Sequence, residues 1–257
     1  MCVARPASMR RVVTPLFVVG LLGGCMVGDD PDEPEDEYND PGIAADDGKM
    51  DAASSVDSVV RATCSTIPVR GLSIQIAEEV RCMSPGLLVS FAETSSVRFS
   101  SLAVLPYLSS DTASALTRAA SQAGGISVNS GLRSLAQQYL LYRWRELGRC
   151  GIRSAAPPGR SNHETGRAVD LGNTSAARSS MLDHGFTNLS FDPVHYDHLA
   201  SPDLRDVGVE AFQRLWNRNH ADDTIQEDGI YGPETASRLA RAPSGGFARS
   251  ACAETNP

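Results

Sequence analysis

The sequence predicts an α+β fold with a small helical module at its C-terminal end. Segments typical of short strands and of amphipathic helices follow one another over roughly residues 70–200, without the regular strand–helix–strand rhythm of a parallel sheet. The chain has 257 residues, of which 41% are hydrophobic and 21% charged, so it can build a real core in one or two domains. No apolar run approaches the ~20 residues that a membrane-spanning helix needs.

The first predicted elements are a helix and a buried strand. Ile74, Ala77 and Val80 recur at helical spacing and predict a helix over 73–81. The apolar run at 86–91 (GLLVSF) is typical of a buried strand.

The middle of the body continues this alternation. A helix over 112–123, which Asp111 can cap, is followed by a strand at 126–129 and a helix over 134–147. The Gly-, Pro-, Ala- and Ser-rich stretch at 151–162 predicts a loop.

The rest of the body predicts a strand at 167–171, a helix over 175–184 and a strand around 194–196. Beyond it, two apolar helical faces separated by a turn predict a helical hairpin. The apolar face of the first helix consists of Val209, Phe212, Leu215 and Trp216, and the turn is Asp228-Gly229. The second helix has Pro233 in its first turn and an apolar face of Ala236, Leu239 and Ala240.

The N-terminus is typical of an export signal. Three of the first 11 residues are arginines, and an apolar run at 12–24 follows them. The run ends in Leu-Gly-Gly-Cys25, which resembles the lipobox of bacterial lipoproteins. We therefore expect residues 1–24 to be removed and Cys25 to carry a lipid; an ordinary signal peptide with a chance cysteine is the alternative.

The formal net charge of -8 is concentrated in one segment. Residues 29–51 hold eleven acids and one lysine and contribute -10, whereas residues 1–24 contribute +3, so the remainder is almost neutral. We expect an acidic disordered tether over 25–60, a main domain over 61–202, and the helical module with a tail over 203–257. The acidic balance of the chain argues against nucleic acid as the main partner, because phosphate binding needs clustered Lys and Arg.

Four cysteines remain for the body after Cys2 and Cys25 are set aside. Four cysteines in an oxidising compartment predict two disulfides, for which three pairings are possible. We expect Cys64–Cys82, because these two are close in sequence, and hence Cys150–Cys252. A cysteine zinc site is the alternative, but the chain has no CxxC pair.

Two histidines and two aspartates have the spacing of a metal centre. A catalytic zinc takes three protein ligands and keeps one position open, and His163, Asp170 and His195 can supply them. Asp192, three residues before the last histidine, is then a candidate to move a proton between water and a leaving amine. A hydrogen-bonded His–Asp pair without metal is the alternative.

The same residues resemble the VanY-type D-alanyl-D-alanine carboxypeptidases. Every position of that family's SxHxxGxAxD motif is matched, in Ser161, His163, Gly166, Ala168 and Asp170.

Two further blocks strengthen this resemblance. Residues 130–134 and Gln138 resemble the family's SGYRS…Q element, with Leu132 in the place of Tyr, and DPVHY at 192–196 resembles its third block. The blocks occur in the family's order and cover about residues 70–200.

The resemblance implies a zinc peptidase of the hedgehog/DD-peptidase fold that cuts peptidoglycan stem peptides. It implies one zinc ion bound by His163, Asp170 and His195, Asp192 as general base, and Arg133 as the group that stabilises the oxyanion or holds the substrate carbonyl. The residues implied to line the substrate groove are Ser161 and Gln138.

One departure leaves the scissile bond open. The carboxypeptidases usually carry Glu three before the last histidine, whereas L-alanyl-D-glutamate endopeptidases, including phage endolysins, resemble this chain in having Asp there. We expect a lipid-anchored D-alanyl-D-alanine carboxypeptidase that faces the periplasm or cell wall. An L-alanyl-D-glutamate endopeptidase and a non-catalytic wall-binding lipoprotein are the alternatives.

The helical hairpin has a resemblance of its own. The string AFQRLW…DGIYGPET is similar to the type-one peptidoglycan-binding domain, with Thr235 in the threonine position. This implies affinity for the cell wall, while a hairpin that only packs on the main domain is the alternative.

Overall fold

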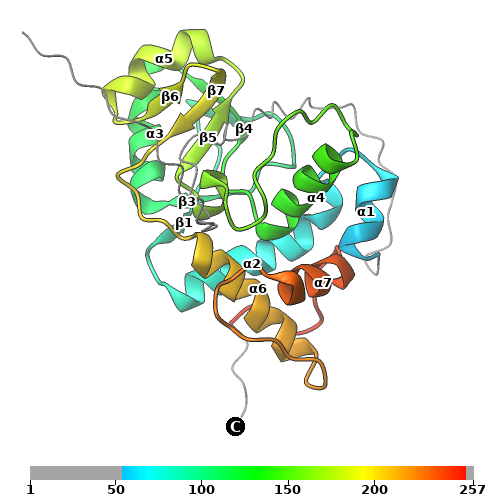
Figure 1. The fold of residues 1–257 in the computed structure, drawn as a ribbon. Coiled ribbons are helices and arrows are strands. Elements are labelled where there is room, and N and C mark those ends of the chain that lie inside the picture. Colours follow the sequence, from blue (N-terminus) through cyan, green and yellow to red (C-terminus); the bar gives the residue numbers. More distant parts are fainter. Residues whose placement is uncertain (1–53, 253–257) are drawn as a thin grey trace, which may run out of the picture. The chain divides into compact units, whose positions relative to one another are not determined.

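The computed structural model describes residues 54–252 (Figure 1). The predicted signal peptide, Cys25 and most of the predicted tether lie outside this range. None of the helices in this range combines the length and the apolar character that a membrane span requires. Helix α1 (Val56–Ala62) lies partly inside the range predicted as tether, so the boundary placed at residue 60 is wrong. Val56, Val59 and Val60 are buried on one side of this helix, which is why these residues are ordered.

A five-stranded sheet is the centre of the fold. Its strands follow the order β2-β4-β5-β7-β6, and only the β2–β4 pair is parallel. The described chain is therefore a mixed fold of helices and sheets, in agreement with the predicted class. The bounds are β2 (Val97–Phe99), β4 (Ile126–Ser130), β5 (Ala168–Leu171), β6 (Thr187–Leu189) and β7 (Asp192–Asp197).

Two helices pack against this sheet, α3 (Ser110–Ala123) and α5 (Thr174–Asp183) (Figure 1). Leu116 of α3 and Met181 of α5 are fully buried in one apolar cluster with strand residues such as Leu171. Helix α3 begins one residue before the predicted cap Asp111, which lies in its first turn instead. A two-stranded sheet, β1 (Leu88–Ser90) with β3 (Tyr107–Ser109), leads into α3.

The remaining helices form a second core that the sheet does not share. Trp144, Leu72 and Phe212 are fully buried in it. Its helices are α1, η1 (Ile67–Val69), α2 (Arg70–Met83), α4 (Leu135–Glu146), α6 (Arg205–Asn219) and α7 (Pro233–Arg241).

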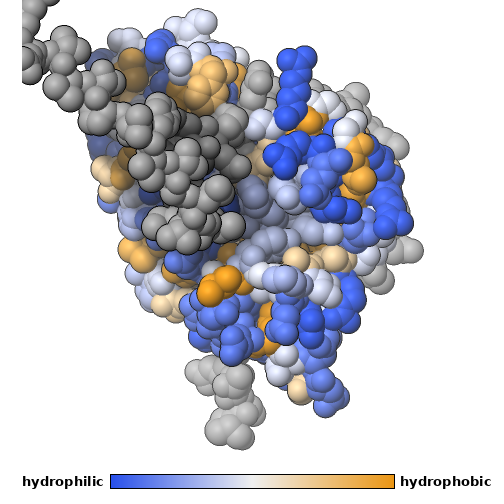
Figure 2. Space-filling model, in the orientation of Figure 1, coloured by the Kyte–Doolittle hydropathy of each residue, from blue (hydrophilic) through white to orange (hydrophobic). Residues whose placement is uncertain are grey.

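The C-terminal hairpin belongs to this second core. The buried carboxylate of Glu79 on α2 accepts hydrogen bonds from Arg214 and Arg218 of α6, at 2.8–3.1 Å. Over α6 and α7 the surface in view is mostly hydrophilic (Figure 2). The hairpin thus packs on the main body, as in the alternative stated above.

Several residues of the pattern that resembles a wall-binding domain form hydrogen bonds with one another inside the hairpin. The Gln213 side chain donates to Asp228 Oδ1 at 2.8 Å and to Thr235 Oγ1 at 3.1 Å, and it accepts from Gly229 N–H at 2.9 Å. One buried amide therefore ties α6 to the Asp-Gly turn and to the start of α7.

The disulfides differ from the predicted pairs. Cys64 bonds to Cys150 and Cys82 bonds to Cys252, with Cα–Cα distances of 5.3 and 5.8 Å. The expected Cys64–Cys82 pair is wrong because the two cysteines lie at opposite ends of the segment containing α2. That helix alone has 14 residues, or roughly 21 Å at 1.5 Å per residue, far beyond disulfide reach.

Candidate metal centre

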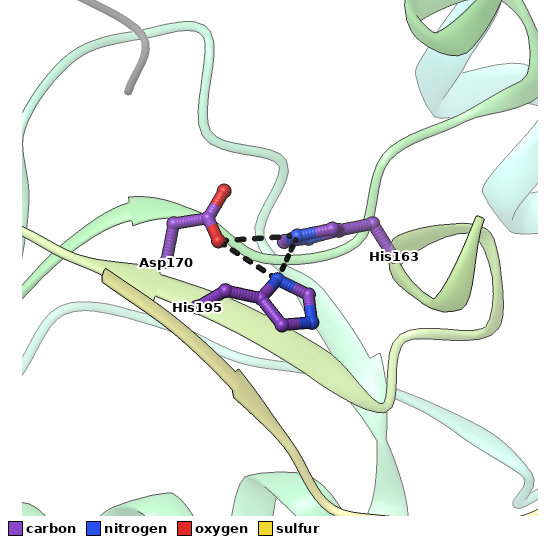
Figure 3. Close-up of side chains that lie close together, drawn as sticks. All are labelled: His163, Asp170 and His195. Carbon is purple, nitrogen blue, oxygen red and sulfur yellow. Dashed lines mark hydrogen bonds and ion pairs between the residues drawn. The ribbon is translucent and has the colours of Figure 1, made fainter. Parts of the chain in front are cut away.

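Three elements bring His163, Asp170 and His195 together. Asp170 on β5 lies directly opposite His195 on β7, and His163 comes from the short 3₁₀ turn η2 (Asn162–Thr165). His163 Nε2 lies 3.2 Å from Asp170 Oδ1 and 3.2 Å from His195 Nδ1, and His195 Nδ1 lies 3.1 Å from Asp170 Oδ1 (Figure 3). Three potential ligand atoms thus form an almost equilateral triangle.

The sequence around His163 explains its placement. Ser161 Oγ accepts from His163 N–H at 3.3 Å, and the Glu164 carboxylate accepts from Ser161 N–H at 3.1 Å, so the two side chains cap the N-terminal end of the turn reciprocally. Gly166 ends the turn at φ 68, and a Cβ there would lie 2.7 Å from Ser109 N. Only glycine combines this backbone conformation with so close an approach.

The backbone also selects the tautomer of His163. Its Nδ1 lies 2.9 Å from the carbonyl oxygen of Gly131, which can only accept a hydrogen bond. The proton of the neutral ring is therefore on Nδ1, and the lone pair of Nε2 points towards Asp170 and His195.

Asp170 is a buried charge stabilised by its neighbours. Burial would raise the pKa of its carboxyl, but the attraction and hydrogen bonds of His163 and His195 outweigh it and hold that pKa well below the usual range. For His195 burial acts in the opposite direction and lowers the pKa of the ring. The hydrogen bonds and charges of Asp170 and Asp197 outweigh this and raise that pKa well above 6.5. The group stabilises positive charge at its centre, whether a proton or a metal ion carries it.

The donor set fits a metal ion. Nitrogen, oxygen and nitrogen donors are those that zinc accepts, and tetrahedral bonds of ~2.0–2.1 Å place donors about 3.3 Å apart. The observed separations of 3.1–3.2 Å are close to this value. The three residues can therefore hold a metal ion.

Asp192 lies at the beginning of β7 with its side chain buried. Its Oδ1 accepts from Val194 N–H at 3.3 Å, whereas its Oδ2 has no hydrogen-bond partner in the part of the chain that the structure describes. Burial and the charge of Asp170 raise the pKa of the Asp192 carboxyl to about 6. The residue is thus a buried carboxylate beside the donor triangle, with one oxygen available to accept a proton.

Arg133 reaches the site through Asp170. Its Nη2 lies 3.4 Å from Asp170 Oδ2, and its Nη1 donates to Gln138 Oε1 at 3.0 Å. Only 3% of the arginine is exposed. The structure brings Arg133 to the donor triangle through this contact with Asp170, a potential metal ligand.

Ser161 and Gln138 do not have the contacts of groove-lining residues. Ser161 is 1% exposed and caps the turn that carries His163. Gln138 is fully buried between Arg133 and the carbonyl oxygen of Ala156, to which it donates at 2.7 Å. Both residues position the site from within the protein.

Sequence reasoning missed two groups that contact the histidines, the Gly131 carbonyl and Asp197. A backbone carbonyl leaves no trace in side-chain spacing. Asp197 could have been found from the strand period of two, which places it on the same face as His195.

The fold and the donor set define a mixed α/β domain with a candidate metal centre. The family model VanY, described as D-alanyl-D-alanine carboxypeptidase, matches residues 106–195, about a third of the chain. This segment contains Arg133, His163, Asp170 and Asp192 and ends at His195. The match indicates a peptidase domain of the kind that acts on peptidoglycan. No curated protein and no solved structure matches the chain.

Proposed function

We propose that this protein is a zinc-dependent peptidase that hydrolyses amide bonds in peptidoglycan stem peptides, foremost as a D-alanyl-D-alanine carboxypeptidase. The observation that carries the proposal is the donor triangle of His163, Asp170 and His195, with Asp192 beside it. It lies in the segment that matches the carboxypeptidase family.

The residues of the triangle would hold one zinc ion. When bound, zinc supplies a Lewis acid that polarises a carbonyl oxygen and makes water more acidic. The Gly131 carbonyl keeps His163 in the tautomer that a metal ligand needs, since its contact fixes the proton on Nδ1.

Asp192 would move the proton. Its Oδ2 has no partner of its own in the described chain and would accept the proton of the attacking water. As the carbon–nitrogen bond breaks, the same oxygen would give this proton to the leaving amine. A carboxyl pKa raised to about 6 suits a group that takes up and releases a proton near neutral pH.

Arg133 would stabilise negative charge on the carbonyl oxygen, the role implied by the family resemblance. Its observed contact with Asp170 Oδ2 gives it a second use, because it compensates the buried charge of a ligand. The two roles are separable: loss of the first lowers the turnover rate with zinc in place, whereas loss of the second lowers zinc occupancy.

The second candidate function is an L-alanyl-D-glutamate endopeptidase. The aspartate at position 192 favours it, because the resembling carboxypeptidases usually carry glutamate there. The third, a non-catalytic wall-binding lipoprotein, would retain zinc without hydrolysis.

Mass spectrometry of muropeptides incubated with the purified, zinc-loaded full chain separates these functions. Loss of a terminal D-alanine from pentapeptides is the expected result. Cleavage between L-alanine and D-glutamate would replace the carboxypeptidase by the endopeptidase. Unchanged muropeptides, with zinc bound and the protein retained on isolated cell walls, would favour the non-catalytic protein.

We also propose that Cys25 carries a lipid that anchors the exported protein to a bacterial membrane, with the acidic tether between anchor and domain. The lipobox-like end of the N-terminal apolar run supports this. Metabolic labelling with a fatty acid should mark the wild-type chain and not a Cys25→Ser chain; equal labelling of both would contradict it. Peptidoglycan affinity of the C-terminal hairpin is tested by binding to isolated cell walls.

A further inference from the structure

A second carboxylate lies on the far side of His195. Asp197 Oδ1 is 3.1 Å from His195 Nε2, the ring nitrogen that points away from Asp170. Their side chains are 6% and 1% exposed. Within residues 54–252 neither atom has a partner with full hydrogen-bond geometry, so at this distance a small change in orientation would pair them with each other.

The strand pairing fixes this contact. His195 and Asp197 are two residues apart on β7 and therefore point to the same face of the sheet. Their partners on β5 are Asp170 and Ala168. Directly opposed side chains are only ~4.5–5.5 Å apart at Cβ, so Asp197 faces the small side chain of Ala168 and not a second charged group.

We propose that Asp197 is a positioning residue that holds His195 as a metal ligand through Nδ1. A carboxylate can only accept, so a hydrogen bond to Asp197 places the ring proton on Nε2 and leaves the lone pair of Nδ1 directed at the donor triangle. The inference rests on the zinc centre proposed above.

The two histidines would then be held in complementary ways. In His163 the Gly131 carbonyl fixes the proton on Nδ1 and frees Nε2, whereas in His195 Asp197 fixes it on Nε2 and frees Nδ1. The nitrogens freed in this way are the two that lie 3.2 Å apart in the triangle. One histidine is set by the backbone and the other by a side chain, so only the second can be tested by substitution of its partner.

The test measures zinc affinity of the full chain by competition with a chromogenic chelator. Asp197→Ala removes the acceptor and should raise the zinc dissociation constant about 10–100-fold. Asp197→Asn keeps a neutral amide oxygen and should give a smaller rise, between the wild type and Asp197→Ala. The control is Asp183→Asn, an exposed carboxylate at the end of α5 that contacts Gln122, and it should leave the dissociation constant unchanged.

A merely structural carboxylate gives a different result. It would change the melting temperature and leave unaltered both the zinc dissociation constant and the visible spectrum of the cobalt-substituted protein. A folded Asp197→Ala chain with a dissociation constant within twofold of the wild type overturns the inference. If that variant does not fold, the same result for Asp197→Asn overturns it. A wild-type chain that binds no zinc contradicts the proposed metal centre itself, and this inference with it.

Discussion

Gly166 ends the turn that carries His163, and its replacement by alanine measures how strongly that turn is constrained. The residue has a φ of 68, and an added Cβ would lie 2.7 Å from Ser109 N and 3.2 Å from the carbonyl carbon of Leu108. Both are backbone atoms of the β3–α3 junction. Because Ser109 N–H also donates to Gly166 O at 3.0 Å, the two segments cannot separate without losing that hydrogen bond.

Two terms set the expected loss of stability. A left-handed backbone costs a non-glycine residue about 1–2 kcal/mol. Forcing an extra carbon against packed backbone costs typically another 1–3 kcal/mol. We therefore expect Gly166→Ala to lower the free energy of unfolding by about 2–5 kcal/mol, and to weaken zinc binding because His163 is three residues away in the same turn.

Gly124→Ala is the matched control. Gly124 also follows a helix end at a positive φ, 73, but a Cβ there would meet nothing within 4 Å. It should cost only the backbone term of about 1–2 kcal/mol. Urea denaturation with the disulfides intact gives both values. Equal losses in the two variants, or an unchanged zinc dissociation constant in Gly166→Ala, would refute the steric argument.

Three further predictions follow from the site and its supports. Asp192→Asn should retain zinc but lose at least a hundredfold in the hydrolysis rate, since proton transfer by a positioned group contributes about 10²–10⁴-fold; undiminished hydrolysis would exclude Asp192 as the base. Glu79→Gln should destabilise the protein by roughly 3 kcal/mol at neutral pH, because it leaves Arg218 in a buried pair without its charge partner. Burial raises the pKa of Glu79, but hydrogen bonds from Arg218, Cys252 N–H and Arg214 lower it overall below 4.5. The stability that Glu79 gives the folded protein is therefore present above pH ~4.5 and is lost as the pH falls through the lowered pKa. An acid-unfolding curve of the variant as steep as that of the wild type would contradict this. Non-reducing peptide mapping should find Cys64–Cys150 and Cys82–Cys252, and Cys64→Ser with Cys150→Ser should cost about 2–5 kcal/mol; a Cys64–Cys82 peptide would contradict the pairing.

The grouping of the three candidate ligands could be predicted from sequence because it depends on residue types at fixed local spacing. Asp170 and His195 each lie on a predicted strand, and the structure pairs them directly. The contacts around them could not be predicted in the same way. Ser161 and Gln138 have side chains suited to binding a substrate, and only the three-dimensional contacts show that they bond inward.

The disulfide pairing failed for a related reason. Closeness in sequence favours Cys64–Cys82, but the helix between them separates their ends. Cys150 follows α4, which packs beside α1, and this brings it to Cys64 from 86 positions away. Which distant cysteines pair depends on how the helices pack, and the number and spacing of cysteines in the sequence do not show this.

The predicted boundary at residue 203 separates parts that depend on one another. Arg205, at the start of α6, donates to the carbonyl oxygen of Arg160 at 2.9 Å, directly before the turn that holds His163. A Cβ on Gly159 would lie within 3.4 Å of Val209 on α6 and Tyr231 before α7, so the hairpin packs closely against the loop that enters the site. The C-terminal residues therefore support the loop that positions His163, a proposed metal ligand.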